Sequence, residues 1–169
     1  RGWTMHILPP DPKPLAYVTP NAFVTSDVTN TFKVFIYNNG PAGDTLKQAR
    51  ILVPDIFTNF SAGMTVESLL LGTTDIERVT LKGTNWIWLK YADGGKSIGS
   101  LNDPGGLQPH DEVTIKVADN VYNTPNRYWF EVFADNETGN AFTNDFSATN
   151  RASTLLPNSQ YVDLLYPPV

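Results

Sequence analysis

The sequence predicts an all-β fold, an antiparallel β-sandwich of about eight or nine strands. Short segments in which every second residue is apolar recur along the chain, and this is the period of a strand with one buried face. Turns rich in Gly, Pro, Asn and Asp separate these segments at short intervals. No segment shows a clear apolar period of 3.6 residues, so no helix is expected.

Residues 31–54 show this pattern most clearly. In the first half, Phe32, Val34 and Ile36 share one face of the expected strand, and the residues between them share the other. The sequence NNGPAGD at residues 38–44 then supplies the residue types that form tight turns. A half-buried strand followed by a turn is therefore expected here.

A second strand is expected at residues 48–53. Ala49, Ile51 and Val53 would face the core, whereas Arg50 would face outward. Pro54 ends the strand because proline has no backbone N–H to donate to a neighbouring strand. In the loop that follows, Phe57 and Phe60 are expected to anchor the loop to the core.

Residues 1–14 are expected to form a Pro-rich, extended segment or linker, separate from a single sandwich domain at residues 15–169. Four prolines in this segment favour a stiff backbone. Ahead of them, Trp3, Met5 and Ile7 occupy alternate positions, a pattern that suits a strand. The chain opens without a methionine or a signal peptide, so we expect a processed or excised form.

The other expected strands are short and lie between turn signals, at residues 15–19, 22–25, 64–71, 76–81, 86–91, 113–117, 128–134 and 161–166. For residues 64–71 the alternative is one helical turn. Within residues 128–134, Tyr128 and every second residue after it should face the core, and Trp129 should face outward. The Gly-rich stretch at residues 93–112 is the longest expected loop.

Composition excludes several classes of function. A chain of 169 residues can bury the core of one domain, and the lack of cysteine excludes disulfides, Cys-based zinc sites and thiol nucleophiles. The net charge of -5 disfavours nucleic acid and anionic membrane surfaces as partners, because both attract basic patches. No apolar run approaches the ~20 residues of a membrane-spanning helix, so no membrane insertion is expected. Asn, Thr and Ser replace many surface charges, as is common in extracellular β proteins.

Three segments recur together in one kind of module. They are TFKVFIYNNGP, ARILVPDIFTNFSAG and LQPHDEVTIKVADNVYNTPNRYWFEVFADNETG. In this combination, residues 15–150 resemble the immunoglobulin-like repeats of archaeal and bacterial cell-surface and S-layer-type proteins. One departure is His110, which stands where such modules often have glycine after the proline.

The resemblance implies an immunoglobulin-like or jelly-roll-type sandwich located outside the cell or on its surface. It also implies a structural role, in which the partners are copies of the chain itself or neighbouring domains of the same surface protein. The motifs are patterns of strand and turn, so they specify architecture better than activity.

No catalytic site is expected. The chain contains no nucleophile elbow, phosphate-binding loop or zinc-protease motif. The run His110-Asp111-Glu112 has the residue types of an acid/base group, but a solvated turn before a strand is the favoured interpretation. We therefore expect a protein that is not an enzyme and needs no cofactor.

Among metal ions, calcium suits this sequence best. Asp135, Glu137 and Asp145 lie in one polar stretch with several Asn residues, and calcium prefers carboxylate and carbonyl oxygens. The spacing does not match the EF-hand loop, and such stretches are more often solvated turns.

Two Asn-x-Ser/Thr sequons mark candidate glycosylation sites at Asn59 and Asn136. Both fall in expected loops, where a glycan is accessible to solvent. Short motifs of this kind also arise by chance in an Asn/Thr-rich chain, so they support a surface location only mildly.

Tryptophans raise the possibility of sugar binding. Trp86 and Trp88 share one face of a strand and would stack on sugar rings if exposed, and Trp129 is a further candidate. The competing interpretation places Trp86 and Trp88 in the core between the sheets, because their strand is apolar on both faces.

The sequence therefore predicts a structural module of a surface protein, lattice or filament. In one version, residues 3–8 add as a strand to an adjacent copy. The alternative is a carbohydrate-binding or adhesion module that uses exposed aromatic side chains.

Overall fold

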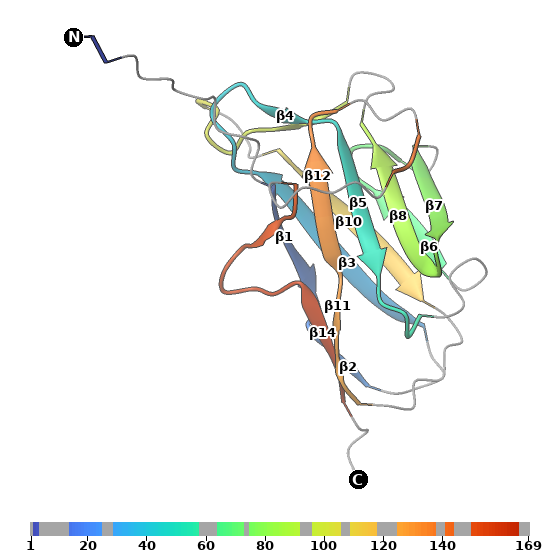
Figure 1. Ribbon diagram of the computed structural model, residues 1–169. Coiled ribbons are helices and arrows are strands. Elements are labelled where there is room, and N and C mark those ends of the chain that lie inside the picture. Colours follow the sequence, from blue (N-terminus) through green and yellow to red (C-terminus); the bar gives the residue numbers. More distant parts are fainter. Residues whose placement is uncertain are drawn as a thin grey trace.

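A computed structural model describes residues 2–3, 14–24, 29–57, 64–72, 75–91, 96–105, 109–117, 125–137, 141–143 and 150–165. Within these residues every regular element is a strand (Figure 1). The all-β fold predicted from the sequence is confirmed. The described part of the chain contains no helix long and apolar enough to cross a bilayer.

The described residues form fourteen strands, more than predicted because several contain only two or three residues. Their bounds are β1 (Pro14–Thr19), β2 (Ala22–Val24), β3 (Asn30–Asn38), β4 (Thr45–Leu46), β5 (Gln48–Val53), β6 (Met64–Ser68), β7 (Ile76–Leu81), β8 (Thr84–Lys90), β9 (Ile98–Gly99), β10 (His110–Val117), β11 (Arg127–Trp129), β12 (Glu131–Asp135), β13 (Ser153–Thr154) and β14 (Tyr161–Leu165).

Two sheets form the layers of the sandwich. One has the order β13-β1-β3-β10-β6 and the other the order β12-β5-β8-β7. In Figure 1, β12, β5 and β8 lie in front of β3 and β10. A three-stranded sheet, β11-β14-β2, extends the molecule at one end, and the short pair β4-β9 lies towards the other (Figure 1).

The core lies between the layers and follows the predicted alternation. On β3, Phe32, Val34 and Ile36 are at most 1% exposed. The neighbouring strand β10 adds its own alternate side chains, with Val113 directly opposite Val34. On the other layer, Ile51 of β5 faces the same core. Burial of these apolar side chains is the main favourable contribution to folding.

Four phenylalanines join the layers near the three-stranded sheet. Phe23, Phe32, Phe57 and Phe130 have ring centroids 5.3 to 6.1 Å apart. Aromatic rings at these distances make favourable edge and offset contacts. Phe57 is buried as the sequence predicted for its loop, and Phe60 lies outside the described residues.

The predicted strand at residues 128–134 is divided into β11 and β12 at Phe130. Before this residue the chain pairs with β14, and after it the chain pairs with β5. The Phe130 N–H donates to the carbonyl of Gln160 (2.8 Å), and its ring is fully buried. The alternation continues across the break, so Trp129 faces outward as predicted and is 51% exposed.

Most strand pairs of the described residues are antiparallel, as predicted, and two pairs are parallel. The first strand run pairs in parallel with the last one: β1 with β13, and β2 with β14. The expected loop at residues 93–112 also contains β9, and β10 begins earlier than predicted, at His110. Residues 4–13 lie outside the described part, so the linker at residues 1–14 stays a prediction.

Candidate binding pocket beside Trp129

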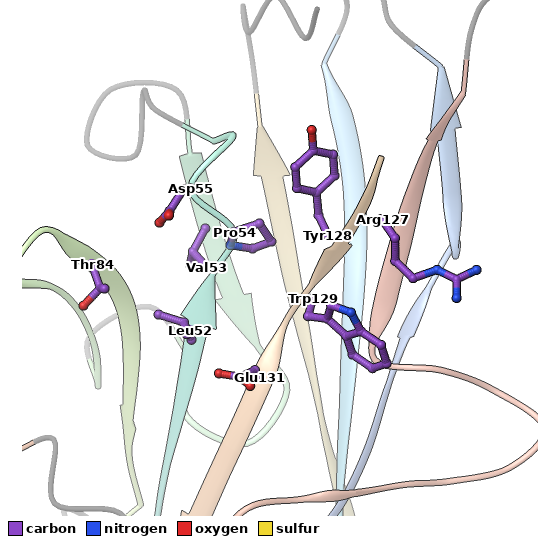
Figure 2. Close-up of a pocket in the computed structure, with 9 residues that line it drawn as sticks. All are labelled: Leu52, Val53, Pro54, Asp55, Thr84, Arg127, Tyr128, Trp129 and Glu131. Carbon is purple, nitrogen blue, oxygen red and sulfur yellow. The ribbon is translucent and has the colours of Figure 1, made fainter. Parts of the chain in front are cut away.

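A pocket of about 350 Å³ opens where β5 ends (Figure 2). It is lined by residues 52–55 at the end of β5, Thr84 of β8, residues 127–129 of β11 and Glu131 of β12. Its volume is at the lower end of the range for ligand pockets, ~300–1,000 Å³. It is therefore large enough for a few side chains or one small ring.

The pocket exists because two neighbouring strands separate. The last rung between β5 and β12 joins Leu52 to Glu131. Beyond it, β5 continues to Val53, which pairs only with β8, and ends at Pro54. β11 instead pairs with β14 and is an edge strand in the part of the chain that the structure describes. The wedge between them is lined by strand edges.

A chain of contacts holds Trp129 in place. Its ring meets the ring of Tyr161 edge-on, with centroids 5.0 Å apart. The guanidinium of Arg127 lies 3.7 Å from the Tyr161 centroid and forms two hydrogen bonds to Asp163, of 2.8 and 3.1 Å. These bonds lower the pKa of Asp163 below its ordinary value. Trp129 thus sits on an ordered support, which reduces the entropy cost of binding.

The polar groups of the pocket differ in how far they are satisfied. The hydroxyl of Thr84 donates to the carbonyl of Leu81 (2.6 Å) and accepts from the Trp86 indole N–H (2.9 Å). Glu131 accepts a hydrogen bond of 2.7 Å from Arg151. Asp55 is exposed and has no hydrogen-bond or ion-pair partner among the described residues. The one charged side chain of the pocket without a partner among the described residues is therefore the carboxylate of Asp55.

Trp86 and Trp88 occupy neither of their two expected environments. They are 6% and 2% exposed, but they lie on the outer face of the β12-β5-β8-β7 sheet and not between the sheets. Phe142 covers them, with ring centroids 5.6 and 5.8 Å away. They form no open sugar platform in this structure.

Arg50 shares this covered outer face, which corrects its predicted exposure. It is only 5% exposed, and its guanidinium lies 5.6 Å from the centroid of the Phe142 ring. The segment at residues 141–143 therefore hides a face that simple alternation assigns to solvent.

The candidate calcium ligands are only partly described. Asp135 is 8% exposed, and its carboxylate accepts hydrogen bonds from the Gln48 side chain (2.6 Å) and the Glu137 N–H (3.0 Å). Glu137 is exposed, and Asp145 lies outside the described residues. No group of three or more acidic or histidine side chains gathers in a metal-binding arrangement within the described ranges. Calcium binding stays a prediction.

The two sequons also differ in what is known of their positions. Asn136 is exposed in the turn after β12, where a glycan would be accessible to solvent. Asn59 lies outside the described residues.

Asp111 contradicts the expected solvated turn at residues 110–112. It lies in β10, is completely buried, and accepts hydrogen bonds from five groups. The donors are the Ser68 hydroxyl (2.6 and 2.8 Å), the Tyr91 hydroxyl (2.9 Å) and the backbone N–H groups of Leu69 (3.1 Å), Leu70 (3.4 Å) and Glu112 (2.8 Å). Five donors compensate for burying a carboxylate, so Asp111 fastens the turn after β6 to β10.

His110 contributes to a second surface on the opposite layer. Its ring stacks on Tyr37 with centroids 4.8 Å apart, and Tyr17 stacks on Phe35 at 4.6 Å. Burial and the neighbouring Tyr37 raise the pKa of Tyr17 to about 12. All four of these side chains are half-buried.

Sequence reasoning identified the outward direction of Trp129 but missed the pocket beside it. Two signals pointed to it: a proline that ends one strand, and a run of alternating residues that passes from one sheet to another. Neither signal reveals that the two segments lie side by side, because that depends on pairing between residues far apart in the chain.

Comparison with known proteins gives no family. No protein-family model matches the sequence, and no curated protein matches it. Among solved structures, BslA, described as a bacterial hydrophobin, is 15% identical, with a TM-score of 0.47 over 95% of this chain and 99% of its own.

Two further structures are similar at the same level. A cohesin module from a Clostridium perfringens ATCC13124 family 33 glycoside hydrolase is 11% identical, with a TM-score of 0.44 over 93% of this chain and 98% of its own. AvmM, described as catalysing macrocyclization in alchivemycin A biosynthesis, is 10% identical, with a TM-score of 0.44 over 95% of this chain and 92% of its own. Similarity at this level carries no conclusion about function.

Proposed function

We propose that this chain is a non-catalytic structural module of an extracellular surface protein, arranged in series with other modules in a lattice or filament. The similarity of its sequence pattern to immunoglobulin-like surface repeats motivates the location. The direction of its terminal strands is the observation that carries the structural role.

The first and last strands of the sandwich run in the same direction. β2 pairs in parallel with β14, with Phe23 opposite Leu164. A backbone hydrogen bond continues this contact, since Asp163 N–H donates to the carbonyl of Asn21 (2.8 Å). The chain therefore enters β1 towards one end of the molecule and leaves β14 at the other (Figure 1).

Entry and exit at opposite ends suit a unit that extends an array. Modules joined at such ends add their lengths, whereas modules with both ends on one side fold back on each other. Units in series can be joined within one chain or can assemble by strand addition between copies.

Buried carboxylates support a non-catalytic role. Asp111 and Asp135 are the buried acidic residues among the described positions, and both accept hydrogen bonds from several donors. A carboxylate held by donors in this way fastens neighbouring strands, and its lone pairs are not free to take a proton from a substrate.

The alternative function, glycan binding or adhesion, now depends on Trp129. Trp86 and Trp88 are covered by Phe142, whereas Trp129 is half-exposed at the edge of a pocket. An exposed indole beside polar groups is a suitable surface for a sugar ring. In this alternative a sugar occupies the pocket. The experiments below distinguish a bound sugar from a bound protein segment.

Location is tested by antibody labelling of the cells that produce the chain. The proposal predicts that an antibody against the folded chain labels intact cells as strongly as permeabilised ones. Labelling that appears only after permeabilisation would contradict an extracellular role. An antibody against a cytoplasmic protein is the control for membrane integrity.

A further inference from the structure

We propose that the pocket beside Trp129 receives residues 3–8 of a second copy, which add as a strand along the edges that line it. This assignment rests on the proposed function and names its partner and contact site. The result is head-to-tail assembly, in which each copy donates its N-terminal segment and accepts that of the next.

The backbone of the pocket suits an added strand. β11 pairs with β14 on one side and is an edge strand of the described chain on the other. Beyond Leu52, β5 no longer has a partner on the β12 side within the described residues. Edges of this kind present backbone N–H and C=O groups that can pair with an incoming segment.

The side chains of the pocket suit the alternation of the donor segment. Leu52, Pro54 and Trp129 provide apolar surface at its rim. A strand places every second side chain on one face, so Trp3, Met5 and Ile7 would face the same way. Main-chain pairing would supply affinity, and these side chains would supply specificity.

The donor segment begins with an exposed tryptophan. Trp3 is 98% exposed. An exposed indole retains a large apolar surface whose burial would favour association. Trp129, 51% exposed, is its counterpart at the pocket.

The positions of the two surfaces favour assembly between copies. The three-stranded sheet that carries Trp129 lies at the end where β14 leaves, whereas β1 begins towards the opposite end (Figure 1). Thirteen residues precede Pro14, and at 3.3–3.6 Å per residue they span at most about 47 Å. A contact between different surfaces of identical units gives an open filament unless a rotation closes it.

Charge adds to this complementarity. The segment before Pro14 carries Arg1 and Lys13 against the single acid Asp11, whereas the whole chain has a net charge of -5. The pocket carries the exposed Asp55, which has no partner among the described residues. Opposite charges on the two surfaces favour encounter and suppress the reverse pairing.

Intermolecular disulfide cross-linking tests the site directly, because the natural chain contains no cysteine. One protein carries Ile7→Cys and the other Asp55→Cys, and the two are mixed in equal amounts and oxidised. Docking raises the effective concentration of one thiol near the other. We expect roughly tenfold more mixed disulfide than with the control variant Glu77→Cys, whose thiol lies on the exposed edge strand β7.

A second measurement follows the size of the assemblies by light scattering. Ile7→Asp and Trp129→Ala should each weaken association of the full chain, because both remove apolar contact at the proposed junction. Thr4→Asp on the opposite side of the donor strand and Leu156→Ala, an exposed residue elsewhere, should leave association unchanged. Equal association of all four variants would overturn the proposal.

Other outcomes identify other occupants. A disulfide formed within one copy carrying both Ile7→Cys and Asp55→Cys, with no mixed product between copies, would show that the segment fills its own pocket and overturn the proposal. Glycan binding that is lost in Trp129→Ala, without cross-linking, would overturn it in favour of a sugar. Labelling of intact cells without cross-linking would leave the surface role standing and reject only this contact.

Discussion

At the scale of single residues, Asp111 shows how a buried charge can strengthen a β-sandwich. Its carboxylate is completely buried and accepts hydrogen bonds from two hydroxyls and three backbone N–H groups. Burial and the adjacent Asp111 carboxylate raise the pKa of Tyr91 well above its ordinary value, so the phenol stays protonated and donates. This contact joins the end of β8 to β10.

Tyr91→Phe should destabilise the fold by about 1.5–3 kcal/mol, because it removes a hydrogen bond to a buried charge. Denaturant unfolding gives the free energy, and an unchanged m-value would show that compactness is preserved. Tyr161→Phe is the matched control, since the Tyr161 hydroxyl has no partner among the described residues, and its cost should stay within about 0.5 kcal/mol. Equal losses in both variants would refute the role assigned to Asp111.

The sequence predicted the direction of single residues well where one face of a strand meets the core. Val34, Phe130 and Trp129 all face as alternation requires. Arg50 also faces outward as predicted, but Phe142 covers it, and the same cover buries Trp88, which the favoured interpretation had placed between the sheets. The favoured interpretation also placed Asp111 in solvent. Alternation assigns a side chain to a face but does not reveal what covers that face or which distant donors meet a carboxylate there.

At the scale of elements, the parallel contact between the first and last strand runs sets how the molecule resists tension. Force applied at the chain ends pulls β2 and β14 along their own axes in opposite directions. Their backbone bonds, such as Asp163 N–H to Asn21 (2.8 Å), are then loaded together and not one after another. Forced unfolding is governed by this barrier.

Pulling a single molecule by its two ends should therefore need a force several-fold higher than peeling the β7–β8 hairpin. Cysteines introduced at Ile76 and Leu89, which are paired across the open end of that hairpin, allow the peeling measurement in the same cysteine-free background. Strand ladders opened from one end break their bonds singly, so the required force is lower. Similar forces in the two geometries would show that the terminal strands bear no load in common.

Sequence patterns located most strands but not their partners. Residues 31–37, 48–53 and 161–166 were recognised from alternation and proline stops, and strands lie there. The short strands β4 and β9 were missed, since two residues are too few to show a period. The parallel pairing of β1 with β13 was also missed, because register between distant segments leaves no local signature.

At the scale of the whole molecule, the proposed role as a connector requires different surfaces at the two ends of the sandwich. The pocket beside Trp129 lies at the end where β14 leaves, and Trp3, which is 98% exposed, belongs to the Pro-rich sequence that precedes β1. The fold class followed from the two-residue period of apolar side chains. The lack of a cysteine-based site followed from composition. The pocket did not, because it forms only where two strands of different sheets separate.

Placement of the chain's entry and exit at opposite ends is the central claim, and small-angle scattering of a tandem fusion tests it most directly. Two copies of the 169-residue chain are joined without an added linker and measured at a dilution where the single copy is monomeric. A fusion with a long Gly/Ser linker, which behaves as a flexible coil, is the control. The account predicts a maximum dimension about twice that of one copy, because a junction with this many prolines favours an extended, semi-rigid backbone. A compact pair, with a maximum dimension close to that of one copy, would contradict it.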